Sequence, residues 1–120
     1  MPNKELTPTD NYYTGKLIVL IDTYTFFTAE SFTLDLKESK TAILIGRPTA
    51  GDTGNRPSTF TTQNNNSFRI PTRKPAQISP LGFFMEGTGI QPDHFVEQTI
   101  EDYMNDIDTV LEYAISINNL

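Results

Sequence analysis

The sequence contains no cysteine and no tryptophan, and it has a single histidine, His94. A chain without thiols forms neither disulfides nor thiolate metal sites, and the redox state of its compartment stays open. Zinc usually has three or four protein ligands, so one histidine does not make a site unaided. We therefore expect no metal and no other cofactor.

Basic residues are also scarce. Nine Lys and Arg residues lie scattered among fifteen Asp and Glu residues, which gives a net charge of −6. Nucleic-acid binding normally needs a basic patch that neutralises phosphates, so we expect no nucleic-acid partner.

Long apolar runs are missing as well. No run approaches the roughly 18 residues that mark a membrane span, and the first eleven residues are polar. We therefore expect no membrane span and no signal peptide in this stretch. If the native protein is exported, its signal lies outside this chain.

The 120 residues are close to the commonest size of one domain. Residues 1–14, MPNKELTPTDNYYT, are polar with two prolines and read as an N-terminal linker. Residues 15–120 are then the domain.

A strand, a helix and a second strand are expected at the start of this domain. KLIVLID (16–22) is a continuous apolar run of strand length, typical of a strand buried on both faces of a parallel sheet. Between Thr28 and Ser39, Ala29, Phe32 and Leu36 recur at helical spacing, and TAILIG (41–46) is a second buried strand. This order predicts a βαβ unit.

The middle of the chain favours short antiparallel strands. STFTTQ and SFRIPT, within residues 58–79, are joined across three asparagines at 64–66, a good turn sequence. Residues 46–57 and 81–93 are rich in glycine and proline and are expected to be loops. HFVEQ (94–98) is a candidate last strand.

A final helix is expected to begin at Thr99, with Asp102 completing an imperfect capping box. Its apolar stripe over about four turns is most simply core packing. Its acidic residues Glu101, Asp102, Asp106 and Asp108 suit a solvated face. The stripe consists of Ile100, Tyr103, Met104, Ile107, Leu111, Ala114 and Ile115.

Five segments in this order resemble the S41 serine peptidases, which include the C-terminal processing (tail-specific) proteases and the tricorn and retinoid-binding-protein-like branch. The resemblance runs from about Tyr13 to about Tyr103. It implies an α/β fold of the ClpP/crotonase-like superfold, present here as the C-terminal portion of the catalytic domain. The implied partial domain has a βαβ unit, short antiparallel hairpins and a C-terminal helix. The segments are YTGKLIVLID (13–22), TFFTAE (25–30), TAILIGRPTAGDTG (41–54), FRIPT (68–72) and EGTGIQPD (86–93).

The resemblance also locates the chemistry. The family has its nucleophilic Ser three residues before a Glu, in a Thr-Phe-Ser-Ala-Ala-Glu pattern at the start of a helix. Counting three residues back from Glu30 gives Phe27 at the position of that Ser. A phenyl ring has no nucleophile and no ionisable proton, so it forms no acyl intermediate. Processing-protease members have a Lys base about 25 residues further on, and Asp52 stands in that place.

The Thr-Ala-Gly sequence of the loop at 49–51 is similar to that of the tricorn-like branch. In that branch the catalytic His comes from the upstream half of the domain. His94 falls just after the Pro-Asp of the signature and is expected to be a partly exposed structural residue. Glu86 stands 59 residues after Phe27, where that branch has an acidic residue of its catalytic network. A plain loop carboxylate is the other interpretation of Glu86.

Thr28 is the first residue to consider as a displaced nucleophile, but its hydroxyl equally suits capping of the helix or contact with solvent. No closely placed base is evident for it, and Thr25 and Ser31 lie off the matched position. The Thr28 N–H fits half of an oxyanion hole. Phe27 itself has two interpretations: its ring fills the emptied oxyanion pocket as ordinary core packing, or it replaces the Ser in order to block the site.

The resemblance implies a serine-type peptidase that cleaves polypeptides through a serine acyl-enzyme, and we predict that this chain alone is inactive. The alternative is a non-catalytic peptide- or protein-interaction module that forms homo-oligomers or pairs with a missing N-terminal half, because strands left without neighbours invite pairing. A different crotonase-fold activity is a third hypothesis, although no acyl-CoA signature supports it. An extracytoplasmic location is suggested by the family alone.

Overall fold

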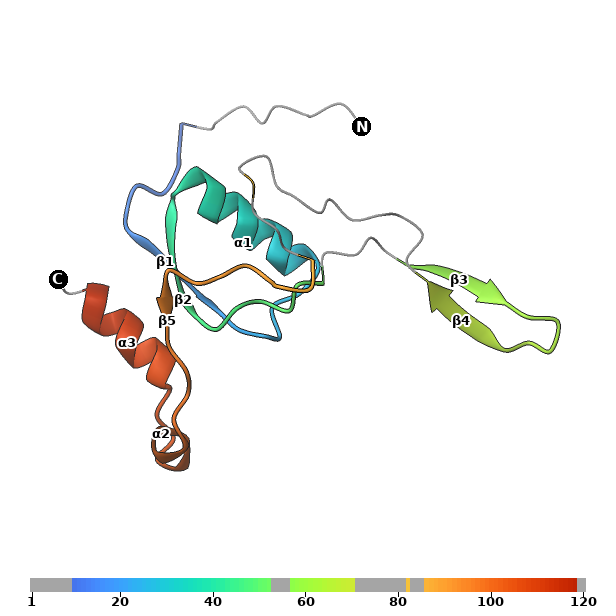
Figure 1. Cartoon of the computed structure of the whole chain (residues 1–120). Coiled ribbons are helices and arrows are strands. Elements are labelled where there is room, and N and C mark those ends of the chain that lie inside the picture. Colours follow the sequence, from blue (N-terminus) through green and yellow to red (C-terminus); the bar gives the residue numbers. More distant parts are fainter. Residues whose placement is uncertain (1–9, 53–56, 71–81, 83–85, 119–120) are drawn as a thin grey trace.

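The computed structural model describes residues 10–52, 57–70, 82 and 86–118, and it shows an α/β fold (Figure 1). Within these residues, three strands form a parallel sheet, two form a separate hairpin, and three segments are helical. The elements are β1 (Leu17–Ile21), α1 (Thr28–Ser39), β2 (Ala42–Gly46), β3 (Ser58–Thr61), β4 (Ser67–Ile70), β5 (His94–Phe95), α2 (Ile100–Met104) and α3 (Thr109–Asn118).

The predicted βαβ unit is confirmed. β1 and β2 pair in parallel with Val19 opposite Leu44, and α1 connects them. β5 adds to the other side of β2, also in parallel, with Ile45 opposite His94. The strand order is therefore β1-β2-β5, so the carboxyl ends of all three strands lie at one edge of the sheet.

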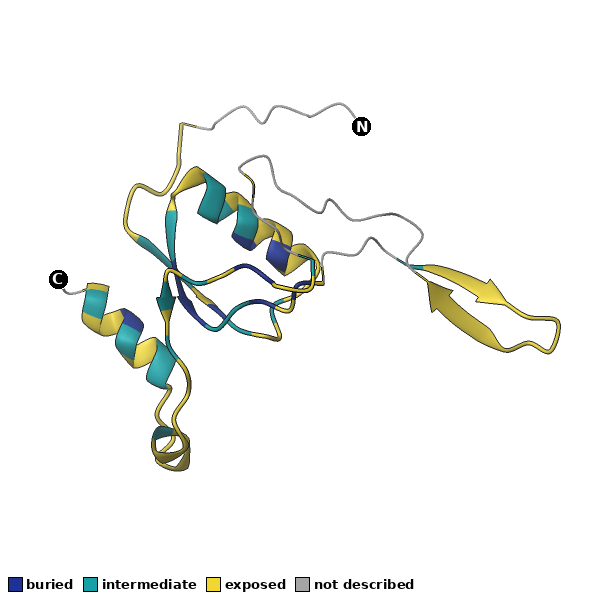
Figure 2. Ribbon diagram, viewed as in Figure 1, coloured by how far each residue is buried: buried dark blue, intermediate teal, exposed yellow. Residues whose placement is uncertain are grey.

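The two long helices lie on opposite faces of this sheet. Val19 and Ile21 of β1 pack on the α1 side, in one cluster with Leu34. Ile18 and Leu20 face α3, because successive side chains of a strand point to opposite faces. The buried hydrophobic residues, coloured dark blue in Figure 2 together with the other buried residues, are Ile21, Leu44, Ile45, Ile90 and Ala114.

β1 is not buried on both faces as its sequence predicts. It is an edge strand among the described residues, and only Ile21 at its end is fully buried. Leu20 leaves 40% of its surface exposed. The apolar run predicted a strand buried on both faces of a parallel sheet; the pairing is parallel, but four of the five residues of β1 are only half-buried or exposed.

The buried face of α1 also differs from the apolar positions of its sequence. Phe32 is 59% exposed, whereas Glu30 and Thr33 are buried. The helix begins and ends where the sequence predicts, and Lys40 closes it in a left-handed conformation. Glu30 is buried on the inner face, where Leu34 also packs, because its carboxylate binds the neighbouring loop, as described below.

The prediction of one continuous C-terminal helix is wrong. Thr99 does cap a helix, since its hydroxyl accepts the Asp102 N–H at 3.0 Å, but α2 ends at Met104. Asp106 has a φ of 56°, which a continuing right-handed helix does not allow. α3 then begins at Thr109.

This break also divides the predicted apolar stripe. On α2, Ile100, Tyr103 and Met104 are 83%, 71% and 74% exposed. On α3, Ala114 is buried against the sheet, with Leu111 and Ile115 beside it about half-exposed. Only the α3 part of the stripe is core packing.

The predicted hairpin of β3 and β4 is confirmed, with Phe60 opposite Phe68 and their rings stacked at 5.6 Å. Asn65 in the turn has a φ of 60°, a conformation that asparagine tolerates well. Every residue of the two strands is exposed. The helices of the described residues include none that is long and apolar enough to cross a membrane.

Candidate functional site

The turn from β1 into α1 holds Phe27 in an unusual backbone conformation. Its φ of 53° and ψ of −120° place it at the N-cap of α1, directly before Thr28. Positive φ is rare for a bulky residue and costs on the order of 1–3 kcal/mol. Such strained residues cluster at functional sites, so this turn is the first part of the molecule to consider as a site.

Several hydrogen bonds fix the turn. The Phe27 N–H donates to the Asp52 carbonyl at 3.2 Å, and the Ala50 N–H donates to the Thr25 carbonyl at 3.0 Å. The Thr25 hydroxyl accepts the Asp22 N–H at 3.2 Å. The loop that follows β2 therefore lies along the turn that follows β1.

The Phe27 side chain is not core packing. It is 39% exposed and meets Phe26 edge to face, with ring centroids 5.4 Å apart. Phe26 is itself half-exposed. The two rings cover each other at the surface of the turn, which corrects the interpretation of Phe27 as a residue filling a buried pocket.

The hydroxyls beside Phe27 have ordinary surroundings. Thr28 is exposed and is the first helical residue, so of the two ordinary roles expected for its hydroxyl, contact with solvent applies and capping does not: the N-cap is Phe27, without a side-chain hydrogen bond. The Ser31 hydroxyl donates to the Phe27 carbonyl at 3.5 Å. Among the described residues, none accepts a hydrogen bond from the Thr28 N–H, as is usual in the first turn of a helix.

Glu30 is the most elaborately bound side chain near the turn. It is fully buried, and its carboxylate accepts three hydrogen bonds: from the Thr49 hydroxyl at 2.5 Å, the Gly51 N–H at 2.7 Å and the Asp52 N–H at 3.0 Å. Buried carboxylates need such partners because desolvating a charge is costly. Glu30 thus fixes the loop that in turn binds Phe27.

The loop at 86–90 is held to the same place. The Ile90 N–H donates to the Thr49 hydroxyl at 2.8 Å, and the Gly87 N–H donates to the Gly51 carbonyl at 2.9 Å. Gly89 has a φ of 69°, and a Cβ there would lie 2.0 Å from the Thr49 carbonyl oxygen. This close approach explains why glycine is needed in the motif.

Glu86 therefore lies next to a residue that binds the loop beside the turn. It is half-buried and precedes Gly87, which binds the loop next to Asp52. The Asp52 backbone joins Phe27 to Glu30: its carbonyl accepts the Phe27 N–H, and its N–H donates to the Glu30 carboxylate. In the loop expected at 46–57, Gly46 and Gly51 have positive φ of 126° and 72°, which glycine adopts readily, whereas Gly54 lies outside the described residues.

Asp93 ends the motif that begins at Glu86. Its carboxylate accepts the Leu44 N–H at 2.9 Å and pairs with the Lys37 ammonium at 3.2 Å, which also donates to the Gln91 carbonyl. Burial raises the pKa of Asp93, but the Leu44 hydrogen bond and the Lys37 charge outweigh it, so the pKa lies below its ordinary value. The motif thereby joins β2 and α1.

His94 lies away from the turn. It is half-buried at the start of β5, and its Nδ1 is 3.0 Å from the Tyr113 hydroxyl on α3. This agrees with the structural role expected for it. The described residues include no group of three or more His, Asp and Glu side chains placed to hold a metal ion.

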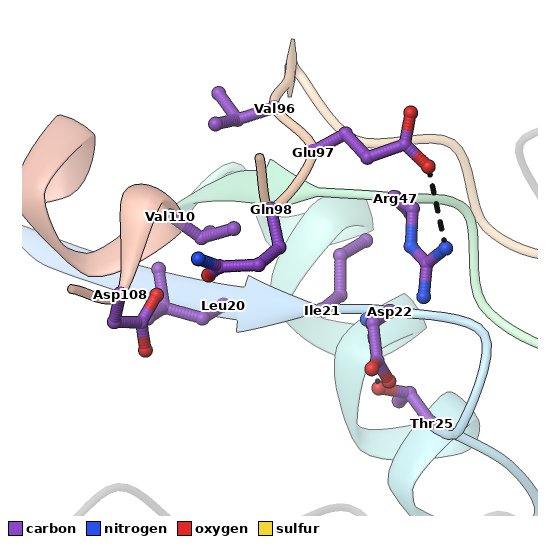
Figure 3. A pocket seen from close by; sticks show the side chains of 10 residues that line it. All are labelled: Leu20, Ile21, Asp22, Thr25, Arg47, Val96, Glu97, Gln98, Asp108 and Val110. Atoms are coloured by element: carbon purple, nitrogen blue, oxygen red, sulfur yellow. Dashed lines mark hydrogen bonds and ion pairs between the residues drawn. The ribbon is translucent and has the colours of Figure 1, made fainter. Parts of the chain in front are cut away.

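A pocket of about 380 Å³ opens at the carboxyl ends of the strands (Figure 3). In open α/β sheets, ligands commonly bind at this edge. Thr25 joins the pocket to the turn that carries Phe27, and Arg47 spans it toward Glu97 at 3.4 Å. The lining residues are Leu20, Ile21, Asp22, Thr25, Arg47, Val96, Glu97, Gln98, Asp108 and Val110.

The sequence model of peptidase family S41 matches residues 2–96 of this chain. The chain belongs to the S41 peptidase family. It corresponds to the C-terminal portion of the catalytic domain.

Solved structures of peptidases have the same fold as this S41 domain. A candidate peptidase from Parabacteroides merdae is 26% identical, with a TM-score of 0.78 over 94% of this chain and 35% of that one. The tricorn protease is 20% identical, with a TM-score of 0.73 over 98% of this chain and 12% of its own. Mature CPAF in complex with lactacystin is 23% identical, with a TM-score of 0.71 over 88% and 20%.

The S41 domain therefore spans about a third or less of the length of these proteins. A search of curated proteins finds no match.

Sequence reasoning located Phe27 through Glu30 but missed what Glu30 does. It also missed Thr49, Asp93 and Arg47. For Thr49 and Asp93, the only signal in the sequence is that each belongs to a motif shared with the family. Arg47 has no such signal, because its pairing with Glu97 joins residues that are 50 positions apart.

Proposed function

We propose that this S41 domain binds polypeptide segments and does not cleave them. The observation that carries the proposal is that the strained residue at the start of α1 is Phe27. The phenyl ring offers no atom that attacks a carbonyl, so no acyl-enzyme forms there. In this proposal, the domain spans residues 15–120, after a linker at 1–14.

The surroundings of Phe27 support the absence of proton transfer. Asp52, at the position of the processing-protease base, uses its backbone to bind Phe27 and Glu30. The imidazole of His94 is bound to the Tyr113 hydroxyl on α3, the helix on the other face of the sheet from α1. Among the described residues, no hydrogen bond joins either side chain to the hydroxyl of Thr25 or Ser31, which supports a site without a general base.

We further propose that the Thr28 N–H is the remaining donor of an oxyanion hole. It lies in the first turn of α1, where N–H groups lack helical partners and the helix dipole favours negative charge. Glu86 is assigned to the acidic network beside this turn, through the contact of Gly87 with Gly51. A loop carboxylate without a role remains the alternative for Glu86.

The test is incubation with a fluorophosphonate probe, followed by intact-mass measurement and peptide mapping. The probe forms a phosphorus–oxygen bond with an activated hydroxyl and releases fluoride. We expect no adduct on the folded chain, while a serine peptidase in the same tube is labelled. A stoichiometric adduct on Thr25, Thr28 or Ser31 would show a displaced nucleophile and overturn the proposal. The Thr28→Val variant is the matched control for its hydroxyl.

The pocket next to the turn supports a binding role. Its charged residues are one guanidinium, Arg47, and the three carboxylates of Asp22, Glu97 and Asp108. This excess of negative charge favours a polypeptide segment that brings a basic side chain. Fluorescence anisotropy with Lys-containing and Glu-containing peptides of equal length tests this preference, and equal affinity would contradict it.

The second candidate function is a non-catalytic module that oligomerises or pairs with another protein through its apolar surface, without using the pocket beside the turn. The observation that favours it is the apolar surface exposed on α2 and along β1. Large exposed apolar patches mark interaction sites. In this case the partner is another polypeptide or a second copy of the chain, and a mass that rises with concentration distinguishes this from a monomeric domain.

A further inference from the structure

One positively charged side chain lines a pocket whose other charged residues are carboxylates. The pocket of about 380 Å³ contains Arg47 together with Asp22, Glu97 and Asp108. A basic side chain of a bound polypeptide would be attracted by the three carboxylates, but it would also meet the guanidinium of Arg47, which has the same sign of charge. Arg47 therefore opposes the ligand that the rest of the pocket favours.

Arg47 lies in the middle of the carboxyl edge of the sheet. It directly follows β2, the central strand of the described sheet, and Glu97 follows β5, the next strand in the sheet. The backbone N–H of Arg47 donates to the Ile21 carbonyl at 3.0 Å, so the backbone is fixed here independently of the side chain. The contact of Arg47 with Glu97 is thus built by β2 and β5, and the outer edge of β1 takes no part in it.

The guanidinium of Arg47 is held loosely. Its Nη1 donates to Glu97 Oε1 (the dashed line in Figure 3) and its Nη2 donates to the Thr23 hydroxyl, both at 3.4 Å. Hydrogen bonds between charged groups are usually about 2.7–2.9 Å long, and a strong guanidinium–carboxylate pair has two of them in parallel. The side chains of Arg47 and Glu97 are 36% and 59% exposed, so solvent competes with their pairing. Such a pair adds little to stability and is easily exchanged.

The other two carboxylates of the pocket are fixed by backbone amides. Asp22 Oδ1 accepts the Tyr24 N–H at 2.8 Å, and Asp108 Oδ1 accepts the Leu111 N–H at 3.0 Å. An amide carries no net charge, so both carboxylates keep their negative charge. Within the part of the chain that the structure describes, neither forms an ion pair with Arg47. Arg47 therefore neutralises Glu97, and the attraction for a cation remains.

Apolar side chains lie between these charged groups. They suit the methylene stem of a lysine or arginine side chain, which commonly packs on apolar surface while its charged end pairs with carboxylates. The apolar lining residues are Leu20, Ile21, Val96 and Val110.

We propose that Arg47 is an internal competitor, whose guanidinium occupies the place at Glu97 that a basic side chain of the bound polypeptide takes. When the ligand binds, its ammonium or guanidinium pairs with Glu97, and the Arg47 side chain moves into solvent. One weak ion pair replaces another and no covalent bond changes. Arg47 thereby lowers the affinity of the pocket for basic segments. The inference rests on the binding function proposed above.

The test is fluorescence anisotropy of the full chain with two labelled, C-terminally amidated peptides of equal length. One peptide has a central lysine, and the other has norleucine there, which keeps an aliphatic chain but lacks the ammonium. Arg47→Met removes the guanidinium and keeps a long side chain. It should raise the affinity for the lysine peptide on the order of fivefold, because it frees Glu97 and removes a like charge. The affinity for the norleucine peptide should not change.

Arg69→Met is the matched control, because it makes the same change of net charge on the exposed strand β4, outside the pocket. It should leave both affinities unchanged. In the double variant Arg47→Met/Glu97→Gln, most of the gain should be lost, because the second change removes the carboxylate that the first one frees. Each variant is first shown to be folded by circular dichroism.

NMR of wild type shows the displacement without reference to affinity. At saturation with the lysine peptide, the side-chain Nε–H resonance of Arg47 should move toward its position in the Glu97→Gln variant, in which the pair is absent. A resonance that stays in place at saturation overturns the inference.

The binding data separate this inference from the binding function on which it rests. If Arg47→Met binds the lysine peptide more weakly than wild type does, Arg47 is an anchor for the ligand, and the inference fails while the binding function stands. No gain, or an equal gain for both peptides, also overturns it, since charge is then not what competes. If neither wild type nor any variant binds the lysine peptide, the proposed binding function fails together with the inference.

Discussion

The Thr49 hydroxyl donates to the buried Glu30 carboxylate at 2.5 Å and accepts the Ile90 N–H at 2.8 Å. One hydroxyl thus connects α1, the loop after β2 and the motif at 86–93. The strained turn at Phe27 is bound to the same loop through Asp52. The shape of the candidate site therefore depends on Glu30, although Glu30 itself is inaccessible to a ligand.

Glu30→Gln should lower the free energy of unfolding by about 2 kcal/mol, because an amide nitrogen then faces a buried N–H donor. The Gly51 and Asp52 amides should exchange faster with solvent. Urea unfolding and hydrogen exchange measure the two effects. Glu112→Gln, at an exposed position of α3, is the control and should stay within about 0.5 kcal/mol of wild type. Equal stability of both variants would contradict the role of Glu30.

At position 27, glycine should give a more stable protein than alanine by about 1 kcal/mol, because glycine adopts a φ of 53° without steric cost. The comparison is made by urea unfolding of Phe27→Gly and Phe27→Ala. At Ala29, which is exposed in α1, the order should reverse, and Ala29→Gly should be about 1 kcal/mol less stable than wild type. The same order at both positions would show that residue 27 is not strained.

Gly89→Ala should be destabilising by about 3 kcal/mol, because it adds a clash with the Thr49 backbone to an unfavourable φ. Gly87→Ala is the matched variant in the same loop. Gly87 also has a positive φ of 74°, but a Cβ there meets nothing within 4 Å, so about 1 kcal/mol is expected. Thermal unfolding of the two variants separates the destabilisation caused by the clash from that caused by the positive φ. Equal destabilisation would contradict the close approach of Gly89 to the Thr49 backbone.

Asp93 should make stability depend on pH in the acid range. Its pKa is lowered in the folded state, so its contribution is complete above the unfolded value of about 3.9 and is lost as pH falls through the folded value. The stability difference between wild type and Asp93→Asn should be constant near neutral pH and shrink below about pH 4. Urea unfolding at several pH values measures it.

The Lys37→Met variant should raise the pKa of Asp93 toward its ordinary value, since it removes the paired ammonium. A titration of the Asp93 carboxyl followed by NMR shows this directly. If the stability difference for Asp93→Asn does not change with pH, the carboxylate is not held by these partners.

Local patterns in the sequence were sufficient for the elements whose signals are short-range. The periodicity at 28–39 and the apolar run at 41–46 predicted α1 and β2, and the asparagine turn predicted the hairpin. The order of the motifs predicted the family. These features depend on residues close together in the chain, where propensity and turn chemistry act.

Features that depend on distant residues were not predicted. The apolar character of residues 17–21 predicted a strand buried on both faces, but the burial of one face depends on packing against α3, which comes much later in the sequence. The break at Asp106 interrupts a stripe that is periodic through 100–115, because Asp102 accepts hydrogen bonds from the Ile107 N–H and the Thr109 hydroxyl there. The burial of Glu30 has the same origin, since its partners lie about 20 residues away.

The hairpin of β3 and β4 projects from the sheet in Figure 1, and none of its strand residues is buried. Its order rests on its own ladder and on the Phe60–Phe68 stack, and isolated hairpins are marginally stable in water. It should therefore open and close as an independent unit, far more often than the sheet unfolds. An epitope or a second recognition sequence grafted between Thr61 and Ser67 would then be displayed by the domain without disturbing its core.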